Sequence, residues 1–376
     1  MIEKRFHDEK LSALGFGCMR LPTLDGKDAD INEAEAARLI ARAMEGGVNY
    51  YDTAWGYHGG NSETVLGRIL KQYPRNSFYL ADKFPGYDLS NMDKVEEIFD
   101  RQLEKCQVDY FDFYLFHNVC EMNIDAYLDP QYHIYDSLMV RKKAGQIRHL
   151  GFSAHGDLNT MRRFLEAYGK DMEFCQIQLN WLDWEFQNAR AKVELLQEWN
   201  IPVWVMEPLR GGKLARLPDE YAARLRELRP EENIPAWAFR FVQSIPSVTM
   251  VLSGMSAMDQ VEDNLNTFAE EKPLSEQERK TLLVIAGSMT GRTSVPCTAC
   301  RYCTSHCPQG LDIPMLLELY NEHAFSGGGF IAPMRIARLT EDKRPSACVG
   351  CHSCEAVCPQ QIKISEVLAG FSAKLG

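Results

Sequence analysis

Long apolar runs and an excess of positive charge are both missing from this chain. No stretch reaches the roughly 18 apolar residues of a membrane-spanning helix, and the opening residues MIEKRFHD lack the apolar core of a signal peptide. The 41 Lys and Arg are outnumbered by 52 Asp and Glu, so the formal net charge is −11. We therefore expect a cytoplasmic protein with no membrane partner and no nucleic-acid partner.

Cysteine is sparse through the first 296 residues and dense after them. Four of the 12 cysteines are scattered, and we interpret them as small buried apolar groups: Cys18, Cys106, Cys120 and Cys175. The other eight follow residue 296. A disulfide framework needs an oxidising compartment, which a chain without a signal peptide does not reach. We therefore interpret the eight as metal ligands.

The glycine fingerprint of open dinucleotide-binding sheets is also absent, because the segment from Gly15 to Arg20 lacks the last glycine of G-x-G-x-x-G. The chain instead alternates apolar strands with helical segments, a pattern typical of a parallel sheet covered on both sides. Eight such units favour a closed (β/α)₈ barrel, and a doubly wound open sheet is the alternative. The predicted strands are 14–21, 48–52, 78–83, 110–117, 147–153, 174–179, 203–206 and 248–252. A short N-terminal hairpin precedes them.

Polar side chains stand at the ends of the predicted strands, where (β/α)₈ barrels build their active sites. Asp52, Lys83 and His117 end three of these strands, and Tyr57 follows Asp52 in a loop. A helix over 62–72 then begins with Ser62 as its N-cap. Together an acid, a lysine, an imidazole and a phenol make a proton-donating site. The plainer alternative is a structural Asp52–Lys83 ion pair with Tyr57 as a rim aromatic.

The chemistry of these four residues suits the reduction of a carbonyl group. Hydride delivered to a carbonyl carbon leaves an oxyanion, which a Tyr with a reference pKa near 10 can protonate. We expect Lys83 to lower the pKa of Tyr57, Asp52 to hold Lys83 charged, and His117 to orient the carbonyl oxygen. Positioned acid catalysis of this kind contributes roughly 10²–10⁴ in rate.

These residues resemble the catalytic tetrad of the aldo-keto reductase family. Asp52-Thr53-Ala54 with Tyr57, Lys83 and His117 come in the family's order, and the segments GFS (151–153), QIQLN (176–180) and EPLRGG (207–212) strengthen the resemblance over about residues 10–270. It implies an NAD(P)H-dependent carbonyl–alcohol oxidoreductase with a small carbonyl or alcohol substrate and Tyr57 as proton donor.

The resemblance also implies which residues hold the cofactor. Nicotinamide would lie at Ser153 and Gln178, the pyrophosphate at the loop after Leu209, and the adenosine end at residues 253–264. The full implied set is Gly17, Met19, Asp52, Ser153, Gln178, Met206, Leu209, Gly211, Ser253, Gly254, Met255, Gln260 and Asn264.

Three of the implied cofactor positions depart from the family pattern. Ala154 stands where many members have Asn, Met206 where many stack an aromatic ring, and Gln260 where a basic residue often meets the 2′-phosphate of NADP. Because a guanidinium suits a phosphate and an amide does not, the choice between NADH and NADPH stays open.

The C-terminal cysteines form two C-x2-C-x2-C-x3-C-P runs, the pattern of bacterial two-cluster ferredoxins, in which the fourth Cys of each run serves the other cluster. This implies one [4Fe-4S] cluster on Cys297, Cys300, Cys303 and Cys358, and a second on Cys348, Cys351, Cys354 and Cys307. Zinc is the alternative, but zinc ribbons use paired C-x2-C knuckles. Helical stretches over 313–323 and 333–339 lie between the runs.

A barrel over residues 1–288 followed by a mainly helical two-cluster ferredoxin-like domain over 289–376 resembles the iron–sulfur aldo-keto reductases. Coupling hydride transfer to one-electron clusters normally needs a carrier such as a flavin; a flavin remains possible, although no flavin motif is visible. Three hypotheses follow. The first is a reductase whose clusters exchange electrons with a ferredoxin- or flavodoxin-like partner. The second is a reductase with structural or oxygen-sensing clusters, and the third is a non-catalytic electron-transfer subunit with a vestigial barrel.

Overall fold

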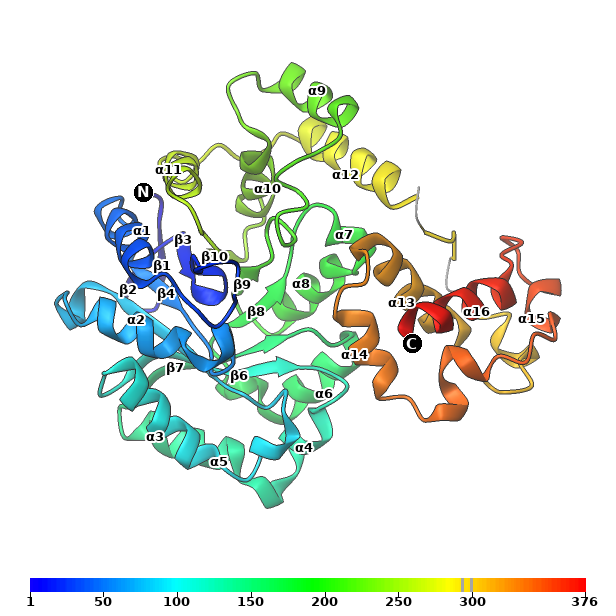
Figure 1. Cartoon of the computed structure of the whole chain (residues 1–376), viewed down its shortest axis with the longest axis horizontal. Helices are drawn as coiled ribbons and strands as arrows, with labels where there is room; N and C mark the ends of the chain where they lie inside the picture. Colours follow the sequence, from blue (N-terminus) through cyan, green and yellow to red (C-terminus); the bar gives the residue numbers. More distant parts are fainter. Residues whose placement is uncertain (292–293, 298–299) are drawn as a thin grey trace. The chain divides into compact units, whose positions relative to one another are not determined.

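Parallel strands close into a barrel in the order β10-β3-β4-β5-β6-β7-β8-β9 (Figure 1). The computed structural model describes residues 1–291, 294–297 and 300–376. The predicted eight-stranded barrel is confirmed within these residues, and the open-sheet alternative is wrong. The strands are β3 (Leu14–Gly17), β4 (Tyr50–Asp52), β5 (Tyr79–Phe84), β6 (Phe111–Val119), β7 (Ile147–Ala154), β8 (Cys175–Gln178), β9 (Val203–Met206) and β10 (Val248–Ser253).

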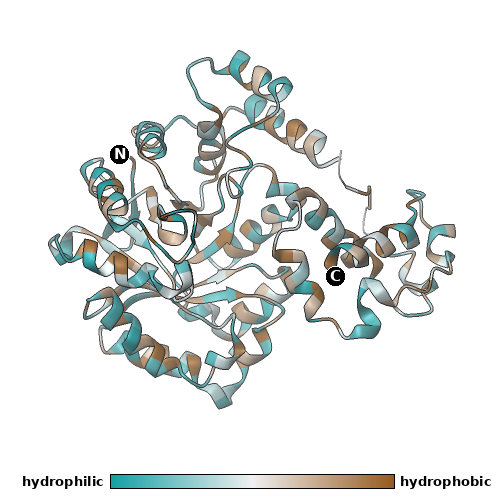
Figure 2. Ribbon diagram, viewed as in Figure 1, coloured by the Kyte–Doolittle hydropathy of each residue, from teal (hydrophilic) through white to brown (hydrophobic). Residues whose placement is uncertain are grey.

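Amphipathic helices surround the barrel. Helix α1 (Glu33–Glu45) buries Ala36, Leu39, Ile40 and Ala43, a spacing of three and four residues that places one stripe against the sheet. Figure 2 shows apolar and polar residues interleaved along the other helices of the barrel. These are α2 (Ser62–Leu70), α3 (Val95–Cys106), α5 (Ile134–Lys143), α6 (Leu158–Tyr168), α8 (Ala189–Glu198), α9 (Asp219–Leu228), α10 (Ile234–Gln243) and α11 (Met258–Thr267), with short helices α4 (Ile124–Leu128) and α7 (Asp183–Phe186).

The predicted N-terminal hairpin, β1 (Glu3–Phe6) and β2 (Glu9–Ser12), covers the end of the barrel where the strands begin. Phe6 reaches into the aromatic core, with its ring centroid 4.9 Å from Trp204 and 5.6 Å from Phe113. Burying large aromatic rings at this end is a main source of the barrel's stability. The opposite end, where the strands finish, is left for the site.

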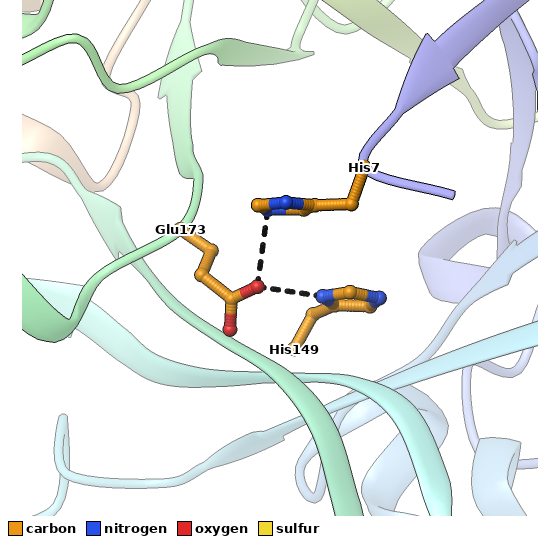
Figure 3. Close-up of side chains that lie close together, drawn as sticks. All are labelled: His7, His149 and Glu173. Atoms are coloured by element: carbon orange, nitrogen blue, oxygen red, sulfur yellow. Dashed lines mark hydrogen bonds and ion pairs between the residues drawn. The ribbon is translucent and has the colours of Figure 1, made fainter. Parts of the chain in front are cut away.

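A polar clasp also holds this hairpin to the barrel (Figure 3). His7, in the hairpin turn, stacks on His149 of β7 at a centroid distance of 5.4 Å. Both rings face one carboxylate oxygen of Glu173, 3.2 Å from Nε2 of His7 and 2.7 Å from Nδ1 of His149. The clasp therefore joins two segments that are far apart in the chain.

The chain divides into two compact units, Met1–Leu282 and Leu283–Gly376. This division and the boundary predicted at residue 288 both fall within α12 (Glu276–Gly291). The second unit contains α13 (Ile313–Ser326), α14 (Ile331–Ala337), α15 (Ser353–Ala356) and α16 (Ile364–Leu375), and its core includes Leu316, Leu317, Leu368 and Phe371. Among the described residues, no helix has the length and apolarity needed to span a bilayer.

Candidate active site and cysteine centres

Three neighbouring strands bring the predicted tetrad together. Asp52 is the last residue of β4, Lys83 is next to last in β5, and His117 lies near the end of β6. Lys83 Nζ donates to Asp52 Oδ1 at 2.6 Å and lies 3.5 Å from the Tyr57 hydroxyl. The Tyr57 and His117 ring centroids are 6.1 Å apart. Because adjacent parallel strands end at the same edge, the four side chains share one mouth of the barrel.

Buried hydrogen bonds fix the loop that carries Tyr57. His58 has a left-handed backbone (φ 54°) and a buried ring that accepts from the Leu21 N–H at 3.0 Å. Ser62 Oγ donates to the Cys18 carbonyl at 3.1 Å and lies 2.9 Å from Thr53 Oγ1. The expectation that Ser62 caps helix α2 is wrong, because Asn61 occupies the N-cap position and Ser62 ties the turn after β3 to this loop.

Charge is buried at the centre of the site. Lys83 and Asp52 are each less than 3% exposed. Burial favours the neutral forms of both groups, but the Asp52 carboxylate raises the pKa of Lys83 above its usual value, so the lysine stays charged. Burial raises the pKa of Asp52, and Lys83 counteracts this. The two groups therefore form a desolvated ion pair.

Two opposing effects set the pKa of Tyr57. Burial has the larger effect and raises the pKa of Tyr57 above 10, while Lys83 lowers it, as expected. Because desolvation disfavours the phenolate, the hydroxyl keeps its proton throughout the neutral range. The raised pKa suits a group that gives up its proton only to a strong base.

His117 is held as a neutral imidazole. Burial, then the Lys83 charge, lower the pKa of His117 well below 6.5. Its Nδ1 is buried and has no hydrogen-bond partner among the residues that the structure describes. The half-buried ring of Tyr87 meets the His117 ring edge-on, with the centroids 5.1 Å apart. Tyr87 was not among the predicted site residues, because its loop shows no polar strand end.

A second polar network supports Lys83 from the helical layer. Gln102 on α3 donates to Glu63 (3.0 Å), to Asp82 (2.9 Å) and to the Lys83 carbonyl (3.0 Å). Burial and the Glu63 carboxylate raise the pKa of Asp82 well above its usual value. These fully buried groups hold the end of β5 in position, and no sequence motif indicated them.

The predicted nicotinamide residues lie at the mouth of the barrel, and some already have protein partners. Ser153 is buried, and its Oγ accepts from the Asn118 N–H at 2.7 Å. Asn118 Oδ1 is buried without a hydrogen-bond partner, a group that fits the N–H of a carboxamide. Asn118 was not predicted, and it stands close to where the family's amide is replaced by Ala154.

Gln178 belongs to a buried network that sequence reasoning missed. Its Nε2 donates to Asp183 at 2.8 Å, as does Asn180 Nδ2 at 2.7 Å, and Arg210 Nε contacts Asp183 Oδ1 at 3.0 Å. Asp183 and Arg210 are buried and form an ion pair. This network anchors the loop after β9, which carries the predicted residues Leu209 and Gly211.

The predicted residues of the adenosine end gather after β10. Asn264 Nδ2 donates to Ser253 Oγ at 3.0 Å, and Met255 is fully buried, so these three support the loop. Gln260 and Gly254 are exposed, and the Gln260 side chain accepts from the Ser256 N–H at 2.8 Å. Elsewhere at the mouth, Gly17 packs against the Ser253 backbone, Met19 is exposed and Met206 is half-buried.

The second unit brings cysteines of both runs together. One pocket is lined by Cys297, Cys300, Cys303 and Cys358, the set predicted for one cluster. Burial, with Cys297, Cys300 and Cys358 nearby, raises the pKa of Cys303 to about 11. Burial likewise raises the pKa of Cys354 to about 11, with Cys348 and Cys307 among its neighbours. Thiols converging from both runs fit cubane clusters held by crossed ligands. The four scattered cysteines are buried, as expected.

Comparison with known protein families identifies the family to which this chain belongs. Residues 13–283 match the aldo/keto reductase family and residues 296–363 a 4Fe-4S dicluster domain. The chain therefore belongs to the aldo/keto reductase family, whose members are oxidoreductases, and carries a C-terminal 4Fe-4S dicluster domain.

Individual relatives agree with this assignment. The chain is 24% identical over 307 residues to the uncharacterized oxidoreductase YqkF of Bacillus subtilis, covering 73% of this chain and 92% of the relative. It is 24% identical over 301 residues to the NADH-specific methylglyoxal reductase of Escherichia coli, covering 69% and 90%. The holo structure of aldo-keto reductase AKR11C1 from Bacillus halodurans has a TM-score of 0.63 and 27% identity, covering 76% of this chain and 96% of that one.

Proposed function

We propose that the protein reduces an aldehyde or ketone with a nicotinamide cofactor, and that Tyr57 is the proton donor. The observation that carries this proposal is the contact of Lys83 Nζ with Asp52 Oδ1 at 2.6 Å and with the Tyr57 hydroxyl at 3.5 Å. An ion pair with a merely structural role needs no phenol and no neutral imidazole at the same strand ends. A vestigial barrel would not be expected to keep this arrangement.

The reaction would use each group in the protonation state that its surroundings favour. A bound reduced nicotinamide supplies the hydride. His117, neutral because burial lowers its pKa, donates a hydrogen bond to the carbonyl oxygen. Tyr57 transfers its proton to that oxygen as negative charge develops there, and the Lys83 ammonium stabilises the phenolate left behind. Asp52 keeps Lys83 charged and aimed at Tyr57.

The residues at the mouth fit the two ends of a dinucleotide, with NADH as the form we propose. The nicotinamide would contact Ser153, Asn118 and Gln178. The pyrophosphate and the adenosine end would contact the loops after β9 and β10. At the adenosine end, Asp259 accepts from the Gln260 N–H at 2.9 Å, so an acid and an amide stand where a 2′-phosphate would require positive charge. The NADH-specific E. coli relative supports the same choice.

We further propose that two [4Fe-4S] clusters exchange single electrons with a ferredoxin- or flavodoxin-like partner. The ligands Cys300 and Cys351 are exposed, and beside them Tyr302 and Val349 each keep 61% of their surface exposed. Clusters this close to a protein's surface can pass electrons outward, and apolar side chains around them offer a contact area for a carrier.

The experiment that tests the proposed reaction is a Tyr57→Phe substitution. We expect NADH-driven carbonyl reduction to fall at least about 100-fold, since positioned acid catalysis contributes that much, while NADH binding is retained. Tyr87→Phe is the matched control, because Tyr87 also borders His117 but lies outside the Lys83 contact. Full activity in the Tyr57→Phe protein would show that the tetrad assignment is wrong.

A further inference from the structure

An arginine outside the predicted set stands where three loops of the barrel meet. Strands β9, β10 and β3 are consecutive in the barrel, so the loops that follow them lie together at its mouth (Figure 1). Arg20 ends the short 3₁₀ turn Cys18–Arg20 after β3. Its carbonyl accepts a hydrogen bond from Ser256 Oγ at 2.6 Å, which ties this turn to the loop after β10.

The Arg20 side chain crosses from one loop to the other. Its Cβ, Cγ and Cδ lie 3.1–3.4 Å from the position that a Cβ atom on Gly254 would take. Its Nη2 lies 3.4 Å from the corresponding position at Gly211, in the loop after β9. The two glycines therefore provide the surface on which the side chain lies, and the guanidinium ends beside the loop predicted to meet the pyrophosphate.

The charge of Arg20 is not neutralised by a neighbour. Within the described residues its guanidinium forms no hydrogen bond or ion pair, and the residue is exposed. Arg210, by contrast, is buried against Asp183. The Oε2 atom of Glu207 lies 3.7 Å from the same Gly211 position, but within the described residues Glu207 and Arg20 form no ion pair. A guanidinium with free donors suits the paired oxygens of a phosphate.

The loop after β9 leaves room for a ligand beside Arg20. Gly211 and Gly212 have φ angles of 63° and 91°, and neither residue carries a side chain that would fill the space next to the guanidinium. In (β/α)₈ barrels the loops after the seventh and eighth strands, here β9 and β10, frequently bind phosphate.

We propose that Arg20 binds the diphosphate bridge of the dinucleotide. This inference rests on the proposed function, because it assigns a residue to the cofactor of that reaction. Arg20 does not touch the tetrad, so its role is in binding and not in hydride or proton transfer.

Binding measurements on Arg20 variants test the proposal. The holoprotein would be titrated with NADH and with ADP-ribose, which keeps the diphosphate and lacks nicotinamide, and with adenosine, which has no phosphate. We expect Arg20→Gln to weaken NADH and ADP-ribose binding about 10- to 100-fold, the effect of losing a charge-assisted hydrogen bond, and to leave adenosine binding unchanged. Arg20→Lys should recover part of the loss. Saturating NADH should restore kcat.

Two control variants separate a charge effect from a structural one. Arg38→Gln removes an exposed arginine on α1 that pairs with Glu35, and it should change no affinity. Glu207→Gln should leave ADP-ribose affinity equal or tighter, because it removes negative charge beside the phosphates. Equal affinity of Arg20→Gln and wild type for ADP-ribose would overturn the proposal and leave the proposed function intact. Equal losses for adenosine would show that Arg20 only shapes the loop, whereas a wild-type protein that binds neither NADH nor ADP-ribose would overturn both.

Discussion

At the scale of single residues, the site depends on charges removed from water. The charges of Lys83 and Asp52 neutralise each other in the interior, where either charge alone would strongly destabilise the fold. The same burial holds His117 neutral and Tyr57 protonated, because it disfavours every isolated charge. The four groups therefore enter the reaction in defined protonation states, without titrating near neutral pH.

This predicts the pH dependence of catalysis. The pKa of His117 is lowered well below 6.5 and that of Tyr57 is raised above 10. For carbonyl reduction, kcat/KM should therefore stay level between these values, fall in acid when His117 gains a proton, and fall above pH 10 when Tyr57 loses one. A pH profile at saturating NADH measures this, with substrates that do not themselves ionise. A clear inflection at neutral pH would show that other groups control the reaction.

At the scale of secondary-structure elements, the strand ends and the loops hold different parts of the candidate site. The ends of β4, β5 and β6 place the tetrad, and the loops after β9, β10 and β3 form the corner where Arg20 lies. The opposite end of the barrel is closed by the β1–β2 hairpin and its His7–His149–Glu173 clasp. The candidate active site and the hairpin that closes the barrel thus lie at opposite ends, so each can be mutated separately.

A prediction about stability belongs to the hairpin clasp. Burial alone would raise the pKa of Glu173, but hydrogen bonds from His149 and Lys142 lower it to about 2. A lowered carboxyl pKa contributes stability above its unfolded value of 4.5, and this is lost as pH falls toward 2. Glu173→Gln should therefore lower the unfolding free energy by about 2 kcal/mol at pH 7, with a smaller difference at pH 4.

Denaturant titrations followed by tryptophan fluorescence measure this effect, because all six tryptophans lie in the first 282 residues. Glu271→Gln, which removes only an exposed pair with Lys4, is the control and should change stability little. A Glu173→Gln protein as stable as wild type at pH 7 would mean that the clasp contributes nothing.

At the scale of the whole molecule, two units with different chemistry share one chain. Hydride transfer moves two electrons together, while a cubane cluster passes one. The tetrad and the contacts described between its members lie within Met1–Leu282, and the cluster cysteines lie within Leu283–Gly376. The barrel therefore contains the groups that the proposed reduction requires.

A cluster variant tests this separation. Cys303→Ser should lower the iron content by about half, because Cys303 is a predicted ligand of only one of the two clusters. NADH-driven reduction should persist, while electron delivery from a chemically reduced ferredoxin is lost. Iron and sulfide assays with both activities, on anaerobically prepared protein, would show this. Loss of the NADH-driven activity together with the iron would place the clusters on the catalytic path, and Cys175→Ser controls for loss of a buried thiol.

The sequence by itself determined the barrel, the order of the tetrad and the two cysteine runs. These features are local: apolar strands and amphipathic helices show in their periodicity, and strand ends and ligand spacings can be read from neighbouring residues. The tertiary structure alone decided the rest. Ser62 ties the turn after β3 to the loop after β4 instead of capping a helix, Asp183 pairs with Arg210, and burial outweighs Lys83 in setting the pKa of Tyr57. Each depends on contacts between distant segments and on exclusion of water, which no local pattern records.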